Sequence, residues 1–102
     1  MNNFLLFSKD SCGPCMLVEK YFKAIGDERT SIIQKIDLED VSKDPIPQKN
    51  LDLAKEYSVT ATPVLIVTSP KGTLLERKTG GLEITQNIRK LFDQYAKSKS
   101  TL

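Results

Sequence analysis

Both cysteines of the chain fall in one four-residue segment, Cys12-Gly13-Pro14-Cys15, and this segment constrains the fold more than any other feature. The apolar run Phe4-Leu5-Leu6-Phe7 that precedes it is typical of a buried strand. After it, apolar residues recur at helical spacing from Val18 to Ile25. Pro14 suits a first helical turn because its missing N–H has no partner to lose there. The pattern therefore predicts a strand, a short loop and a helix that begins at the cysteines.

This placement predicts a reactive thiol. Amide groups and the dipole at a helix N-terminus favour the thiolate form of Cys12, and Cys15 is close enough to exchange a disulfide with it. A structural zinc site needs about four Cys or His ligands, but the chain has two Cys and no His. Met16 stands where a c-type haem site has histidine. A purely structural bridge across so short a loop would constrain the unfolded chain little. We therefore expect redox chemistry with no metal and no bound cofactor, only a redox-active Cys12–Cys15 disulfide.

Length and charge exclude several other classes. A chain of 102 residues suits one domain, which we assign to residues 1–97, with 98–102 as a flexible tail. The net charge is +2 with acidic and basic residues interspersed, so no nucleic-acid or membrane partner is expected. No segment approaches the roughly 18 apolar residues of a membrane span, and the N-terminus lacks signal-peptide features. We expect a cytoplasmic monomer whose cysteines rest reduced between turnovers.

Hydrophobic patterning along the chain predicts an α/β fold. We expect strands near residues 3–7, 32–37, 64–67 and 73–78, and helices over 14–25, 51–57 and 84–95. Asp40 to Asn50 is predicted to form a loop or an irregular start of the second helix. The order β-α-β-α-β-β-α predicts a mixed four-stranded sheet flanked by helices, with a parallel first pair and a late antiparallel hairpin.

Four motifs in this order resemble the thioredoxin superfamily over residues 3 to 96. Cys12-Gly13-Pro14-Cys15 has the same spacer as thioredoxin, and the stretch Lys35 to Glu39 is similar to the family's strand beside the active site. Thr60-Ala61-Thr62-Pro63-Val64 resembles the loop whose proline is cis and faces the cysteines. Lys78-Thr79-Gly80-Gly81 resembles the glycine turn before the last helix. The resemblance implies a thioredoxin fold.

The resemblance also implies roles for these residues. Cys12 attacks a substrate disulfide and Cys15 resolves the mixed disulfide, in a loop that also contains Ser11, Gly13 and Pro14. Thr62 and Pro63, together with Gly80 and Gly81, would line the path of an extended substrate. The implied activity is that of a protein-disulfide reductase.

Three positions depart from the family's pattern. Ser11 replaces the aromatic residue before the first cysteine, which makes the surroundings of Cys12 more polar. Leu6 replaces a buried aspartate that helps take the proton of the second cysteine, so we expect slower resolution by Cys15 unless water or another carboxylate supplies the base. Lys35 thereby loses its family partner; we expect it to reach solvent or Glu39, or to have a lowered pKa.

The layout leaves three functional classes open. Disulfide-containing proteins are the expected substrates of a small thioredoxin-like reductant recharged by a flavoprotein thioredoxin reductase. The second class is a glutaredoxin-like redoxin, because the short N-terminus resembles that of glutaredoxins. Such a redoxin would be coupled to glutathione or dedicated to one client such as ribonucleotide reductase. A redox-inert docking module is the third class. Between Glu39 and Pro63 the chain is longer than thioredoxin, and the extra length falls around Val41 to Asn50. We interpret it as a surface elaboration, either a plain loop or a specificity element.

Overall fold

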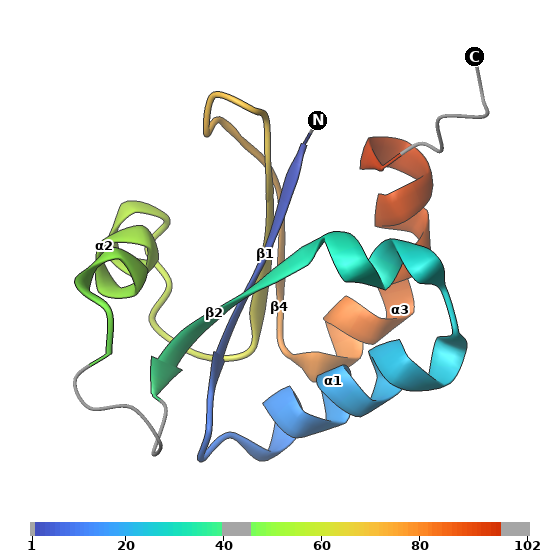
Figure 1. The fold of residues 1–102 in the computed structure, drawn as a ribbon, viewed down its shortest axis with the longest axis horizontal. Coiled ribbons are helices and arrows are strands. Elements are labelled where there is room, and N and C mark those ends of the chain that lie inside the picture. The colour runs from blue at the N-terminus through green and yellow to red at the C-terminus, as the bar shows by residue number, and fades with distance from the viewer. Residues whose placement is uncertain (1, 40–45, 97–102) are drawn as a thin grey trace.

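The computed structural model describes residues 2–39 and 46–96, arranged as a central sheet between helices (Figure 1). In chain order the elements are β1 (Asn3–Lys9), α1 (Gly13–Ile25), the 3-10 helix η1 (Glu28–Ile32), β2 (Ile33–Glu39), α2 (Gln48–Glu56), β3 (Val64–Thr68), β4 (Leu74–Thr79) and α3 (Gly81–Tyr95). The predicted α/β class and element order are confirmed. Residue 97 and the predicted tail, residues 98–102, lie outside the described residues.

The sheet has four strands in the order β2-β1-β3-β4. β1 runs parallel to β2, with Phe4 beside Ile33 and Leu6 beside Lys35. β3 is antiparallel to both β1 and β4, so the mixed sheet and its late hairpin are confirmed. The continuous apolar run of β3 is buried at every position, as expected of a strand covered on both faces.

Two hydrophobic clusters cover the two faces of the sheet, and β1 contributes alternate residues to each. α1 and α3 lie over one face, whereas α2 lies on the other (Figure 1). The α1/α3 cluster consists of Phe4, Leu6, Val18, Phe22, Leu65, Val67, Ile84, Ile88, Leu91 and Phe92. The α2 cluster consists of Leu5, Phe7, Ile36, Ala54, Tyr57, Val64 and Ile66. Burial on both faces holds β1 rigidly, and this strand leads directly to the cysteines.

Local signals explain where α1 begins and ends. Cys12 is its N-cap, with Pro14 in the first turn, as the sequence predicts. Gly26 ends the helix in the left-handed conformation, with φ of 63°, which costs a residue without Cβ little.

The structure adds two features that patterning did not predict. The 3-10 helix η1 follows α1, capped by Asp27, whose carboxylate accepts a hydrogen bond from the Arg29 amide at 2.9 Å. α2 begins at Gln48 rather than near Leu51, because Pro47 takes the N-cap position. The Asn50 side chain also donates to the Asp37 carbonyl at 2.9 Å, which ties the start of α2 to β2. Residues 41–45 of the predicted elaboration lie outside the described residues.

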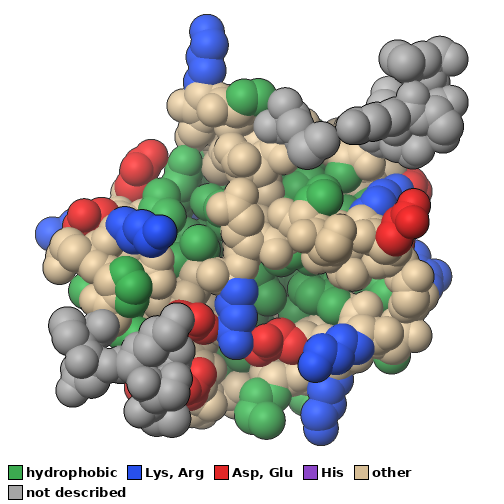
Figure 2. Space-filling model, viewed as in Figure 1, with side chains coloured by type: hydrophobic (Ala, Val, Ile, Leu, Met, Phe, Trp, Pro, Cys, Tyr) green, Lys and Arg blue, Asp and Glu red, His purple; other side chains and the backbone are tan. Residues whose placement is uncertain are grey.

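The surface agrees with the interspersed charge of the sequence. Figure 2 shows basic and acidic side chains intermixed on the viewed face, with hydrophobic side chains between them. Within residues 2–39 and 46–96, no helix is long and apolar enough to cross a membrane.

Candidate active site

The two cysteines lie where β1 gives way to α1, and they differ in accessibility. Cys12 is partly exposed, whereas Cys15 is 0% exposed in the first turn of the helix. They form a disulfide, and the Cys15 amide donates a hydrogen bond to Cys12 Sγ at 3.2 Å. The same amide would stabilise a thiolate on Cys12 once the disulfide is reduced, because charged acceptors form the stronger hydrogen bonds. The geometry therefore separates an accessible sulfur from a protected one.

Two further segments predicted for the site converge on these cysteines. The Thr62–Pro63 bond is cis, as the resemblance implied, and the Pro63 carbonyl accepts a hydrogen bond from the Gly80 amide at 2.9 Å. Gly80 has φ of 92°, where any side chain would be strained. A Cβ on Gly81 would lie 3.5 Å from the Pro14 carbonyl oxygen. The cis-proline loop, the glycine turn and the cysteine loop thus form one contiguous surface.

Ser11, which stands where the family has an aromatic residue, is hydrogen-bonded to Glu39 at the end of β2. Its amide donates to Glu39 Oε1 at 3.0 Å, and the neighbouring Asp10 amide donates to the Glu39 carbonyl at 3.0 Å. Hydrogen bonds from the side chain and then the backbone of Ser11 hold the pKa of the Glu39 carboxyl below its usual value. Glu39 is therefore charged at neutral pH and fixes the loop that precedes Cys12, a role that the sequence alone did not predict.

We expect Glu39→Ala to release this loop locally. Hydrogen exchange at the Ser11 amide should accelerate at neutral pH by about tenfold, because its acceptor is removed. The Asp10 amide should be unchanged because its acceptor is a backbone carbonyl, so it serves as the internal control. Exchange measured by NMR checks this; equal acceleration at both amides would show general loosening of β2 instead.

Lys35 has a different partner from those expected. Its ammonium pairs with Glu19 of α1 at 3.0 Å and lies 3.5 Å from the Asp37 carboxylate, whereas Glu39 bonds to Ser11. The hydrogen bond with Glu19 is the main reason that the pKa of Lys35 is raised. The expectation of a Glu39 partner or a lowered pKa was therefore wrong, because α1 supplies a carboxylate. The expectation that Lys35 reaches solvent is confirmed, since its side chain is 42% exposed.

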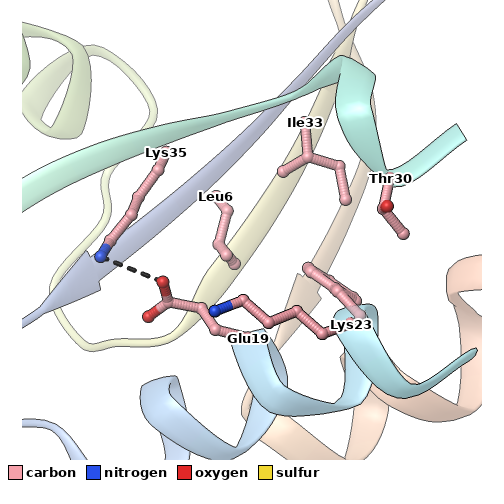
Figure 3. Close-up of a pocket in the computed structure, with 7 residues that line it drawn as sticks. Leu6, Glu19, Lys23, Thr30, Ile33 and Lys35 are labelled. Carbon is pink, nitrogen blue, oxygen red and sulfur yellow. Dashed lines mark ion pairs between the residues drawn. The ribbon is translucent and has the colours of Figure 1, made fainter. Parts of the chain in front are cut away.

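A cavity of about 230 Å³ lies between α1, η1 and β2, beneath this ion pair (Figure 3). Leu6 forms part of its floor, and Glu19 and Lys35 meet across it (Figure 3). Sequence reasoning did not select Glu19, although its position one turn after Cys15 was visible in the helical pattern.

Exposed apolar side chains lie near the cysteines in the chain and beside the glycine turn. Met16 and Leu17 follow Cys15 in α1 and are 53% and 66% exposed, and Leu82 beside the glycine turn is 72% exposed. Since Gly81 packs against Pro14, Leu82 and the start of α1 belong to the same surface. Exposed apolar groups of this kind are typical of protein interaction sites.

The fold and the cysteine pair define the class of thioredoxin-fold domains with a redox-active disulfide, the architecture of thiol–disulfide oxidoreductases. Residues 2–96 match the family described as "Thioredoxin-like domain". The chain belongs to this family.

Known proteins similar to the chain are thioredoxins. Thioredoxin H2 of Arabidopsis thaliana is 31% identical over 87 residues, which are 83% of this chain and 59% of that protein. Among solved structures, thioredoxin NaTrxh of Nicotiana alata aligns with a TM-score of 0.65 at 22% identity, covering 92% of this chain and 72% of that one. Mitochondrial thioredoxin 3 of Saccharomyces cerevisiae aligns with a TM-score of 0.62 at 20% identity, covering 91% and 77%. The chain thus spans about three-fifths of the curated relative's length, and the structural likeness concerns the fold.

Proposed function

We propose that this protein reduces disulfides in other proteins through a Cys12/Cys15 dithiol–disulfide cycle. The observation that carries the proposal is the asymmetry of the pair: Cys12 is partly exposed at the N-terminus of α1, and Cys15 is fully buried behind it. An accessible sulfur can attack a substrate, whereas a protected one can react only with its neighbour.

The cycle has two exchange steps. The Cys12 thiolate attacks one sulfur of the substrate disulfide, forming a mixed disulfide and releasing the first substrate thiolate. The Cys15 thiolate then attacks Cys12 Sγ, releasing the second substrate thiolate and leaving the Cys12–Cys15 disulfide. Two electrons pass to the substrate, and an external dithiol reductant must restore the pair. In the cytoplasm, which we propose as the compartment, such reductants keep the resting pair reduced.

Substrate binding is proposed for the surface formed by the cis-proline loop and the glycine turn. The main chain of Thr62 would pair with an extended substrate segment, and Gly80 and Gly81 would let that segment approach closely. Met16 and Leu82 are exposed on the same surface and would contact apolar residues of the substrate. This arrangement favours a polypeptide substrate over a small disulfide.

The electron donor distinguishes the remaining classes. Insulin reduction by the chain is monitored through the consumption of NADPH. One assay contains thioredoxin reductase, and the other contains glutathione plus glutathione reductase. We expect turnover with thioredoxin reductase and none above the chain-free control with glutathione. Turnover only with glutathione would make the protein a glutaredoxin-like redoxin. Inactivity with both donors, together with inactivity in dithiothreitol, would indicate a redox-inert docking module.

A further inference from the structure

Burial of Cys15 creates a chemical requirement that the cysteines cannot meet alone. Its side chain is 0% exposed, and burial in apolar surroundings disfavours the thiolate needed for the second exchange step. The proton of Cys15 must therefore pass to a base within reach, directly or across one water. Leu6 on the strand beneath α1 offers none.

Glu19 is the carboxylate best placed on α1. It follows Cys15 by four residues, so the two side chains are neighbours on one face of the helix, with Cβ atoms about 5–6 Å apart. Helical side chains lean toward the N-terminus of their helix, which directs Glu19 toward the turn that contains Cys15. No other acidic residue lies in α1.

The structure also holds this carboxylate in place and gives its proton an exit. Lys35 Nζ lies 3.0 Å from Glu19 Oε1, and the pair spans the cavity above Leu6 (Figure 3). The Glu19 side chain is 35% exposed. The cavity of about 230 Å³ is large enough for water, so a proton received from the interior can be passed to solvent.

We propose that Glu19, positioned by Lys35, accepts the proton of Cys15 during resolution of the mixed disulfide. The Cys15 S–H bond breaks as its proton moves to Glu19, directly or across one water. The resulting thiolate attacks Cys12 Sγ and displaces the substrate thiolate. Glu19 then returns the proton to solvent, and no further reactant is needed. This inference rests on the proposed exchange cycle and assigns a residue to its second step.

Other charged groups face the same region and are included in the test. Lys23 lies one turn after Glu19 on α1 and lines the cavity, and the Asp37 carboxylate of β2 lies 3.5 Å from Lys35. Asp37 is the competing base because it contacts the same ammonium. Its substitution therefore provides the matched control.

The test uses one equivalent of Ellman's reagent with the reduced chain under stopped flow. Attack by Cys12 releases a first coloured thiolate, and resolution by Cys15 releases a second. Glu19→Gln should leave the first phase unchanged and slow the second about tenfold at pH 7, a modest factor for a lost base because water in the cavity remains as a weaker proton acceptor. The difference in second-phase rate between Glu19→Gln and the unsubstituted chain should become smaller as pH rises, since hydroxide then deprotonates Cys15.

The amide of Glu19→Gln keeps the shape of the side chain and can still accept a hydrogen bond from Lys35. If Glu19 had only a structural role, the substitution would slow the second phase equally at every pH, and that result would overturn the inference. Asp37→Asn should leave both phases within twofold of the unsubstituted chain. Equal second phases in Glu19→Gln and the unsubstituted chain, or slowing by Asp37→Asn alone, would overturn the inference. Absence of the first phase from the unsubstituted chain would instead contradict the proposed function.

Discussion

We expect Cys12→Ser to abolish the proposed disulfide reduction, and Cys15→Ser to stop the cycle halfway with the substrate trapped as a covalent adduct. A serine hydroxyl at position 12 remains protonated at neutral pH and cannot form a disulfide with the substrate. A serine at position 15 leaves Cys12 at the helix N-terminus with its exposure unchanged, so the mixed disulfide forms but persists.

The two outcomes are measured with the same protein substrate. Intact mass after mixing should show a one-to-one adduct with Cys15→Ser that dissociates in dithiothreitol, and none with Cys12→Ser. Insulin turnover should fall to the chain-free rate in both variants. The double variant is the control for non-covalent association. Turnover by Cys12→Ser, or an adduct through position 15, would reverse the assigned roles of the two sulfurs.

The largest expected effect on stability comes from Phe92→Ala. Phe92 is 0% exposed in the α1/α3 cluster; its ring centroid lies 5.4 Å from that of Phe4, and the Arg29 guanidinium lies 5.0 Å from it. Truncation removes an aromatic contact and a cation–π contact and leaves a cavity between α3 and β1. We expect the free energy of unfolding to fall by about 3–5 kcal/mol, a large part of the total for a domain of this size.

Urea unfolding of the reduced chain, followed by circular dichroism, checks this. Leu82→Ala is the matched control, because Leu82 is an apolar residue of the same helix that is 72% exposed. Its effect should stay within about 0.5 kcal/mol. A loss for Phe92→Ala no larger than that for Leu82→Ala would contradict the expected contribution of the buried face of α3.

The bounds of helices and strands with a clear hydrophobic pattern could be predicted from the sequence to within a few residues. Ile84, Ile88 and Leu91 mark the buried stripe of α3, and the predicted strand at residues 64–67 corresponds to β3 at Val64–Thr68. η1 was missed because its five residues bury no side chain and show no period. The start of α2 was placed too late because a tertiary hydrogen bond from Asn50 to β2, rather than an apolar residue, stabilises its first turn.

The sequence by itself determined the redox motif, the element order and the residues that cap α1, because each depends on neighbours along the chain. Only the tertiary structure decided the partners of Glu39, Lys35 and Glu19. Those partners depend on the register that sets Leu6 beside Lys35 and on the rotation of α1 over the sheet. Both are set by the joint packing of many apolar side chains, and a single long, flexible charged residue carries no signal of which carboxylate it will meet.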